Sequence, residues 1–248
     1  TDEFKGRSGA GLYGDFVCQV DHTVGQVMAA LERRGIAENP LLVFTSDNGP
    51  ECWSADPGGY AIARQYGHYS MAHLRGAKRD TWEGGHRVPF VIRWPGVVEP
   101  GRVSDALISQ IDLMATIAAI VDFELPAHSA EDSHNLLPMI RGVTQASPRT
   151  THVHRTWGRP WGIRDGDWLF IDAPTGALQR DPAELGYDPT PHESVLNHLG
   201  DDPGQRKNLA ADQPQKAGEL RALLQEIRQR GHSAPRLQAE AHLPVEVR

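Results

Sequence analysis

The sequence has few cysteines, no long apolar run and no excess of positive charge, and each absence excludes a class of protein. Cys18 and Cys52 are the only cysteines in 248 residues, so one disulfide at most can form and no CxxC pair indicates zinc. No apolar run approaches the roughly 18 residues that a membrane span needs. The net charge of −7 argues against nucleic acid as the main partner. The remaining composition, 39% hydrophobic and 23% charged, is that of an ordinary globular chain with one or two domains.

Two amphipathic helices are predicted in the first part of the chain. Apolar residues recur at three- and four-residue intervals over 13–34, and Gly35 follows as a stop signal. Ser109 with Asp112 resembles a capping box that opens the second helix. The residues expected on one face are Phe16, Val20, Val24, Val27, Met28 and Leu31 in the first helix, and Met114, Ile117 and Val121 in the second.

Apolar runs at 41–45 and 88–94 predict two strands buried on both faces. A polar segment over 50–81 separates them, and loops of this length in compact domains are usually functional or disordered. Alternating helices and buried strands indicate an α/β fold with a mainly parallel sheet flanked by helices. We therefore expect residues 1–142 to belong to an α/β domain.

The pattern changes near residue 142. Short strands are predicted at 151–157, 161–164 and 168–172. Asp165-Gly166 is a hairpin signal between the last two, and a loop is expected over 173–193. A final helix over about 214–230 carries an apolar face made of Leu220, Leu223, Leu224 and Ile227. Residues 143–248 are thus expected to form a small subdomain of antiparallel strands and one packed helix.

A carboxylate and a carboxamide stand directly after the first predicted strand. Ligands of open α/β sheets sit beyond the carboxyl ends of the strands, which is where Asp47 and Asn48 fall. Both offer oxygen ligands suited to a hard cation such as calcium or magnesium. Asp-Asn-Gly-Pro is also good turn chemistry. The residues alone leave a metal site and a strand-end turn both open.

A second cluster, over 74–89, combines four basic residues with glycines. Lys78 is the sharpest candidate in it, because an ammonium is a compact point charge for phosphate- or sulfate-like oxygens. The alternative is a solvated basic loop in which Lys78, Arg79 and Arg87 pair with Glu83 and Asp80. Both interpretations fit the residue pattern.

Together the two clusters resemble one family. The motifs are Tyr13-Gly14-Asp15, Phe44-Thr45-Ser46-Asp47-Asn48-Gly49, Leu74-Arg75-Gly76-Ala77-Lys78, Trp82-Glu83-Gly84-Gly85, and Val88-Pro89-Phe90 with Trp94-Pro95-Gly96. In this order and approximate spacing they resemble the type I, formylglycine-dependent sulfatases over nearly the full chain, including arylsulfatase and N-acetylgalactosamine-6-sulfatase-like members. The resemblance implies an alkaline-phosphatase-like α/β fold and hydrolysis of sulfate esters.

The resemblance also implies roles for individual residues. Asp47 and Asn48 match two calcium ligands that the family places after this strand. Lys78 matches the lysine that contacts the sulfate and stabilises charge on the departing oxygen. His68 and His73 lie in the long segment that, by analogy with the family, shapes the substrate pocket, and they are candidate substrate contacts.

Part of the family's machinery has no match. The family's nucleophile is a formylglycine made from a Cys/Ser-x-Pro/Ala-x-x-Arg motif, and neither Cys18 nor Cys52 fits it. The paired aspartates of the calcium site and the upstream lysine and histidines also have no counterpart. Since the chain begins without an initiator Met, we expect Thr1 to be an internal point of a longer polypeptide. The chain is then the C-terminal part of a sulfatase, inactive alone, with an apolar face that meets the N-terminal half or a companion chain.

Three other histidines have weaker functional expectations. His86 is expected to be structural because it stands between Gly85 and Arg87, just before a strand. His152 and His154 share one face of a strand, a spacing that can ligate metal, although a surface or packing role is favoured without a third ligand.

Two rival functions fit the same residues. A phosphodiesterase or phosphonate monoester hydrolase of the alkaline phosphatase superfamily shares the metal and lysine chemistry, because tetrahedral oxyanions look alike to a cation and an ammonium. A non-catalytic scaffold module would keep only the fold. The family suggests a periplasmic, secreted or lysosomal location.

Overall fold

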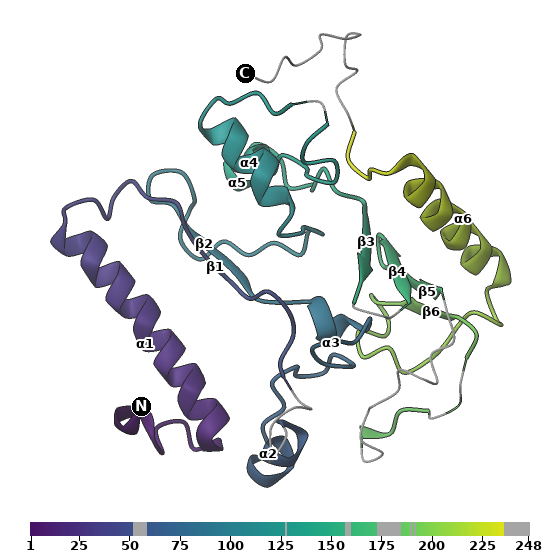
Figure 1. The fold of residues 1–248 in the computed structure, drawn as a ribbon, viewed down its shortest axis with the longest axis horizontal. Coiled ribbons are helices and arrows are strands. Elements are labelled where there is room, and N and C mark those ends of the chain that lie inside the picture. The colour runs from purple at the N-terminus through teal and green to yellow at the C-terminus, as the bar shows by residue number, and fades with distance from the viewer. Residues whose placement is uncertain are drawn as a thin grey trace, which may run out of the picture.

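The first part of the chain alternates helices with two short strands (Figure 1). The computed structural model describes residues 1–51, 59–126, 128–156, 160–172, 185–188, 190 and 192–235. The elements of the first part are η1 (Asp2–Phe4), α1 (Gly11–Arg33), β1 (Leu42–Thr45), α2 (Gly59–Tyr66), α3 (Glu83–His86), β2 (Phe90–Arg93), α4 (Asp112–Ile120) and α5 (Leu137–Ile140). Among the described residues, no helix is both long and apolar enough to cross a membrane.

β1 and β2 form an antiparallel pair in which Leu42 lies opposite Arg93 and Thr45 opposite Phe90. Both predicted strands are therefore confirmed, but in the described residues they do not form the mainly parallel sheet that was expected. The expectation that both strands are buried on two faces is also wrong. Val91 is 58% exposed, because no described layer covers that side of this two-stranded ladder.

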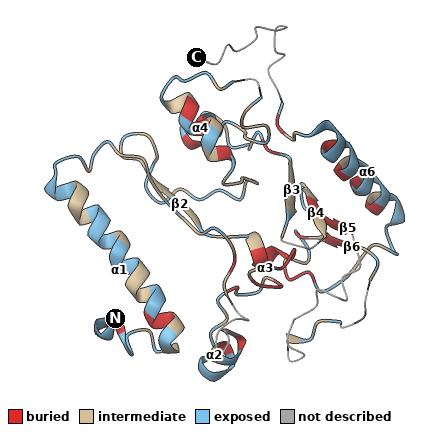
Figure 2. Ribbon diagram, in the orientation of Figure 1, coloured by how far each residue is buried: buried red, intermediate tan, exposed pale blue. Residues whose placement is uncertain are grey.

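The two predicted helices form, but their apolar faces are not buried. α1 packs mainly against η1 and α2, and Phe16 on its apolar face is 60% exposed. Met114 and Ile117 of α4 and Val121, which caps its end, are also exposed. Figure 2 shows the same pattern, with α1 coloured almost entirely as exposed or intermediate. The exposed apolar face that was expected is thus present in the first part of the chain.

The C-terminal part is an antiparallel sheet covered by one helix (Figure 1). The strands β3 (Thr151–Arg155), β4 (Trp161–Asp165), β5 (Trp168–Asp172) and β6 (Val195–His198) are ordered as in the sequence. β4 and β5 form the predicted hairpin, and Gly166 in its turn has a φ of +56°. The strand β6 is not foreseen by the sequence patterns, and most of the predicted loop 173–193 lies outside the described residues.

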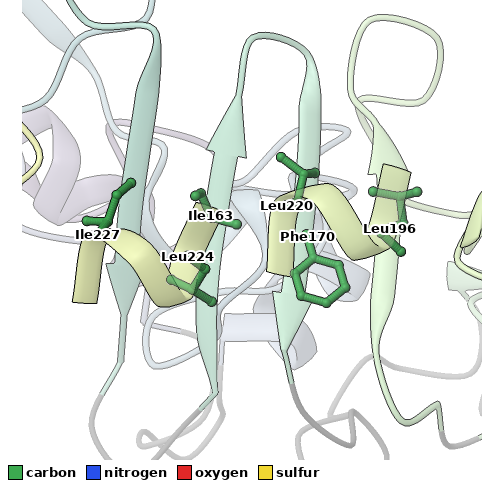
Figure 3. Close-up of a cluster of buried hydrophobic side chains, with 7 residues drawn as sticks. Ile163, Phe170, Leu196, Leu220, Leu224 and Ile227 are labelled. Atoms are coloured by element: carbon green, nitrogen blue, oxygen red, sulfur yellow. The ribbon is translucent and has the colours of Figure 1, made fainter. Parts of the chain in front are cut away.

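The helix α6 (Pro214–Arg230) supplies the core of this sheet. Figure 3 shows three side chains of α6, Leu220, Leu224 and Ile227, facing Ile163, Phe170 and Leu196 from three neighbouring strands. All six are buried. The helix ends at Gly231, whose φ of +76° and bond from its N–H to the Ile227 carbonyl make a left-handed cap.

The opposite face of the sheet is covered by the segment that leads into α3. Trp82 is buried in a cluster with Leu169, Ile171, Val195 and Leu199. Because side chains alternate along a strand, Leu169 and Ile171 point away from α6 while Phe170 points toward it. The sheet thus holds α6 on one face and the segment around Trp82 on the other.

A buried ion pair joins the start of α4 to the chain just before β3. The guanidinium of Arg149 donates to Asp112 through Nε at 2.9 Å and Nη2 at 2.5 Å, and both side chains are fully buried. The Asp112 carboxylate also accepts a bond from the Ser109 N–H at 2.8 Å, which is one half of the predicted capping box. This pair ties the two parts of the chain together.

Candidate active site

The loop after β1 presents Asp47 and Asn48 at the surface. Asp47 is exposed and Asn48 half-buried, and the Ser46 hydroxyl donates to the Asn48 carbonyl at 3.0 Å. The Gln110 carboxamide anchors the start of the loop by donating to Thr45 Oγ1 at 3.1 Å and to the Ser46 carbonyl. Gln110 precedes α4, so a helix start holds the end of the strand. Sequence reasoning did not single out Gln110 for this role.

Two backbone hydrogen bonds bring the Asp47–Asn48 loop against the segment that carries Lys78. The Gly49 N–H donates to the Gly85 carbonyl at 2.9 Å. The Lys78 N–H donates to the Pro50 carbonyl at 3.0 Å. The two candidate clusters, which are separate in the sequence, therefore meet in the structure.

Glycines allow this close approach. A Cβ on Gly49 would lie 1.8 Å from the Gly84 carbonyl oxygen, and one on Gly84 would lie 2.3 Å from the Gly76 carbonyl oxygen. Gly76 itself has a φ of +80°, a region that L side chains rarely adopt. Asp80 closes the turn, since its buried carboxylate accepts a bond from the Ala77 N–H at 2.9 Å. Lys78 stands between these constraints in a tightly packed turn.

The side chains of the three candidate residues make no polar contact with other described residues. Within the described part of the chain, the side chains of Asp47 and Asn48 have no hydrogen-bond partner and the Lys78 ammonium has no ion-pair partner. A carboxylate and a carboxamide have the chemistry to bind a cation, and an ammonium has the chemistry to bind an anion.

Two other basic residues of the cluster are paired, although only Arg87 has one of the partners that the solvated-loop alternative supposed. Arg79 pairs with Glu51 at 2.6 Å, and Arg87 lies 3.5 Å from Glu83. Glu83 is buried, and burial by itself raises its pKa. The hydrogen bond and charge of His86, with the positive charges of Arg164 and Arg87, outweigh that effect and lower the pKa of Glu83. Glu83 thus stays ionised, with His86, Arg87 and Arg164 around its carboxylate. Lys78 is not one of the described residues that contact it.

His68 and His73 are both exposed. His68 follows α2, where its N–H donates to the Ala63 carbonyl at 3.1 Å. In the described residues no hydrogen bond or ion pair links either imidazole to Asp47, Asn48 or Lys78. The structure does not gather these two histidines into the candidate site, and their role as substrate contacts stays a prediction.

His86, His152 and His154 stack at the junction of α3 and the C-terminal sheet. The ring centroids of His86 and His154 are 3.9 Å apart, and those of His152 and His154 are 5.7 Å apart. Burial lowers the pKa of His152 to about 4 and that of His154 well below its usual range. Among the described residues, no three His, Cys, Asp or Glu side chains are placed to hold a metal ion. The packing role favoured for His152 and His154 agrees with this geometry.

Known proteins match most of this sequence. A family model described as Sulfatase matches residues 2–123. An N-acetylgalactosamine-6-O-sulfatase of Bacteroides thetaiotaomicron is 37% identical over 233 residues, which cover 92% of this chain and 44% of that protein. The chain belongs to the sulfatase family. Human arylsulfatase A is 30% identical to this sulfatase chain over 239 residues, covering 91% of the chain and 44% of that protein. The chain therefore spans less than half the length of these two relatives.

Solved structures show the same fold. One, described under the metabolism of multiple glycosaminoglycans by Bacteroides thetaiotaomicron, matches this sulfatase chain with a TM-score of 0.77 at 35% identity. The match covers 92% of this chain and 46% of the chain in that structure. A sulfatase from Pseudoalteromonas sp. matches with a TM-score of 0.70 at 23% identity, covering 94% of this chain and 46% of that one. The alkaline-phosphatase-like fold expected from the motifs is thereby confirmed.

Proposed function

We propose that this chain is the C-terminal part of a sulfatase that hydrolyses aryl or carbohydrate sulfate esters. The observation that carries the proposal is the pair of backbone bonds, from Gly49 to Gly85 and from Lys78 to Pro50, that joins the two loops. They bring the backbone of the loop that carries Asp47 and Asn48 against the segment that carries Lys78. The similarity to an N-acetylgalactosamine-6-O-sulfatase supports a sulfated sugar as one substrate class.

The donor set fits the calcium ion that the family implies. Asp47 and Asn48 offer uncommitted oxygen atoms, which are the ligands that calcium prefers, although calcium takes about six to eight of them. These two residues would hold one side of the ion, and the remaining oxygens would come from outside this chain. When bound, calcium withdraws charge from the oxygens of the sulfate group.

Lys78 has the chemistry for the leaving group. Its ammonium carries three donors and a full positive charge, so it can bind a sulfate oxygen and stabilise the alkoxide or phenoxide that departs. The surrounding turn keeps its backbone fixed, which limits the reorganisation needed during the reaction. Positive charge placed in advance is the main way such charge development is stabilised.

The nucleophile in this proposal is a formylglycine supplied by the N-terminal half of the same protein or by a companion chain. Neither Cys18 nor Cys52 stands in the family's motif for that modification. The exposed apolar face of α4 supports a partner surface, as does an open groove of about 760 Å³ between β2 and α5. Buried apolar area is what stabilises such an association. By itself, the chain is expected to be inactive and to self-associate in light scattering, and a monodisperse monomer would contradict this expectation.

The test is an assay of the complete gene product on an aryl sulfate and on the matching aryl phosphodiester. We expect preferential sulfate turnover that falls on chelation of calcium and falls by about 10²-fold or more in Lys78→Ala. Asp47→Ala is expected to weaken calcium binding, measured directly by calorimetry. Preferential turnover of the phosphodiester would favour the rival hydrolase, and no turnover of either ester would favour the scaffold module.

A further inference from the structure

Gln205 lies in the loop between β6 and α6. Its side chain is buried, and its backbone has an unfavourable conformation that surrounding contacts must stabilise. It is 1% exposed and its φ is +54°, a left-handed backbone that is uncommon for a residue with a Cβ. Its Nε2 donates to Asn197 Oδ1 at 3.3 Å, and Asn197 in turn donates to the Lys207 carbonyl at 2.7 Å. A strained conformation persists where surrounding contacts fix it, often at a functional position.

Gln205 contacts both ends of the segment that carries Lys78. Its Oε1 accepts a hydrogen bond from the Glu83 N–H at 2.8 Å. Its carbonyl oxygen accepts one from Arg75 Nη1 at 3.1 Å. Arg75 and Glu83 flank Lys78 in the sequence, and the Gly84 N–H closes the segment by donating to the Arg75 carbonyl at 2.7 Å. One residue of the C-terminal unit therefore fixes both ends of the lysine segment.

The neighbouring contacts seat this segment on the sheet. The Arg75 guanidinium stacks on the rings of Trp82, at 3.9 Å, and Tyr187, at 4.4 Å. Arg164 of β4 lies 3.4 Å from the Glu83 carboxylate. These contacts press the segment against the C-terminal unit, and Gln205 sets its position there because it bonds to each end.

We propose that Gln205 is a positioning residue that aligns Lys78 with the departing oxygen of the sulfate ester. The inference rests on the proposed function, since it concerns the leaving group that Lys78 would stabilise. It assigns the C-terminal subdomain a part in the reaction that goes beyond covering the sheet. A small displacement of a group that acts on the reacting atoms costs about 10²-fold in rate, so the clamp has a measurable effect.

The amide of Gln205 is required by its two side-chain contacts. A glutamate here could still accept the bond from the Glu83 N–H, but it could not donate to Asn197 Oδ1. It would also bring a second carboxylate toward buried Glu83. Gln205→Glu therefore changes the positioning of the lysine segment with almost no change in side-chain volume.

The experiment measures kcat of the complete gene product for aryl sulfates whose phenol leaving groups span a range of pKa. Gln205→Glu and Gln205→Ala are compared with Lys78→Ala. We expect the loss in kcat to grow with the phenol pKa, reaching about tenfold more for the weakest acid than for the strongest. Adding Gln205→Ala to Lys78→Ala should not steepen this dependence further, because the group being positioned is gone.

Asn208→Ala is the matched control. Asn208 is a carboxamide of the same loop, and its side chain bonds Leu196, Ser194 and Ala210 but nothing in the lysine segment. Thermal melting places all variants on one stability scale, and Asn208→Ala should lower stability without changing the leaving-group dependence. Two Gln205 variants are used because loss of packing alone can prevent Gln205→Ala from folding. Gln205→Glu has nearly the same side-chain volume, so it tests the role if Gln205→Ala unfolds.

The outcomes separate the two proposals. A wild-type product that hydrolyses no sulfate ester overturns the proposed function. An active wild type whose dependence steepens in Lys78→Ala but in neither Gln205 variant overturns the role of Gln205 alone. A dependence that steepens equally in Asn208→Ala also overturns it, because general loosening would then suffice.

Discussion

The C-terminal helix α6 and the helices α1 and α4 of the first part use their apolar residues in opposite ways. In the C-terminal part, Leu220 and Leu224 of α6 are at most 1% exposed against the sheet. In the first part, Met114 and Ile117 of α4 are 56% and 49% exposed although their helical spacing is equally regular. The spacing of apolar residues along a helix therefore predicts which face is apolar. Whether that face is buried depends on a second layer that packs against it.

The consequence is that the two parts depend differently on a partner. Burial of a leucine-sized side chain contributes about 1.5–3 kcal/mol, so the C-terminal part has its own source of stability. The first part contains the Asp47–Asn48 loop and exposes large apolar side chains on α1 and α4. The candidate active site therefore lies in the part that is expected to need a companion surface.

The largest effect is expected from breaking the ion pair that joins the two parts. Arg149→Ala leaves the buried Asp112 carboxylate unpaired and should lower the free energy of unfolding by about 3–5 kcal/mol in chemical denaturation. Arg221→Ala is the control, because its pair with Asp172 is partly exposed and should contribute about 0–1 kcal/mol. Equal losses in the two variants would show that the parts are not coupled through Arg149.

The contrast between the cores is tested next by one substitution in each. Leu224→Ala removes a side chain buried between α6 and the sheet and should cost about 2–5 kcal/mol of unfolding free energy. Ile117→Ala on exposed α4 should cost about 0.5 kcal/mol or less in the isolated chain. A large loss for Ile117→Ala in the isolated chain would break the comparison.

The glycine contact at the candidate site should cost about 2 kcal/mol when it is blocked. Gly49→Ala places a Cβ against the Gly84 carbonyl and forces the two loops apart, an overpacking change. Gly25→Ala is the matched control, since a Cβ at Gly25 in α1 meets nothing within 4 Å. That change should stabilise the chain by about 0.5–1 kcal/mol through helix propensity. Thermal melting measures both, and a stable Gly49→Ala would contradict the backbone-to-backbone contact.

The smallest effect is a pH dependence of the histidine stack. The pKa of His152 is lowered by burial to about 4, while in the unfolded chain it is near 6.5. The unfolded state therefore binds more protons between these values, and stability falls as the pH is lowered through this window. The loss by pH 5 should be about 1–2 kcal/mol. His152→Gln should flatten the slope of unfolding free energy against pH, and an unchanged slope would show that His152 is not buried neutral.

Sequence patterns predicted the local elements well and the pairing poorly. The helices α1, α4 and α6 and the β4–β5 hairpin follow from periodicity and turn residues, which act over a few neighbours. The strand β6 was missed because Val195–His198 is short, and it is a strand only because Phe170 of β5 lies opposite Leu196. The antiparallel direction of β1 and β2 was also missed, because it depends on residues far apart in the chain.

By itself the sequence determined the family and the candidate site residues, because Asp47, Asn48 and Lys78 stand in short motifs that can be recognised from neighbouring residues. Tertiary structure alone decided how the two segments that carry them meet. The bond from Lys78 to Pro50 needs glycines whose missing side chains matter only when two loops touch. The clamp by Gln205 joins residues more than a hundred positions apart, as its bond to Glu83 shows. The order of residues along the chain determines which face of an element is apolar. Which residues pack against that face, and which bond each polar group, is decided only in the folded molecule.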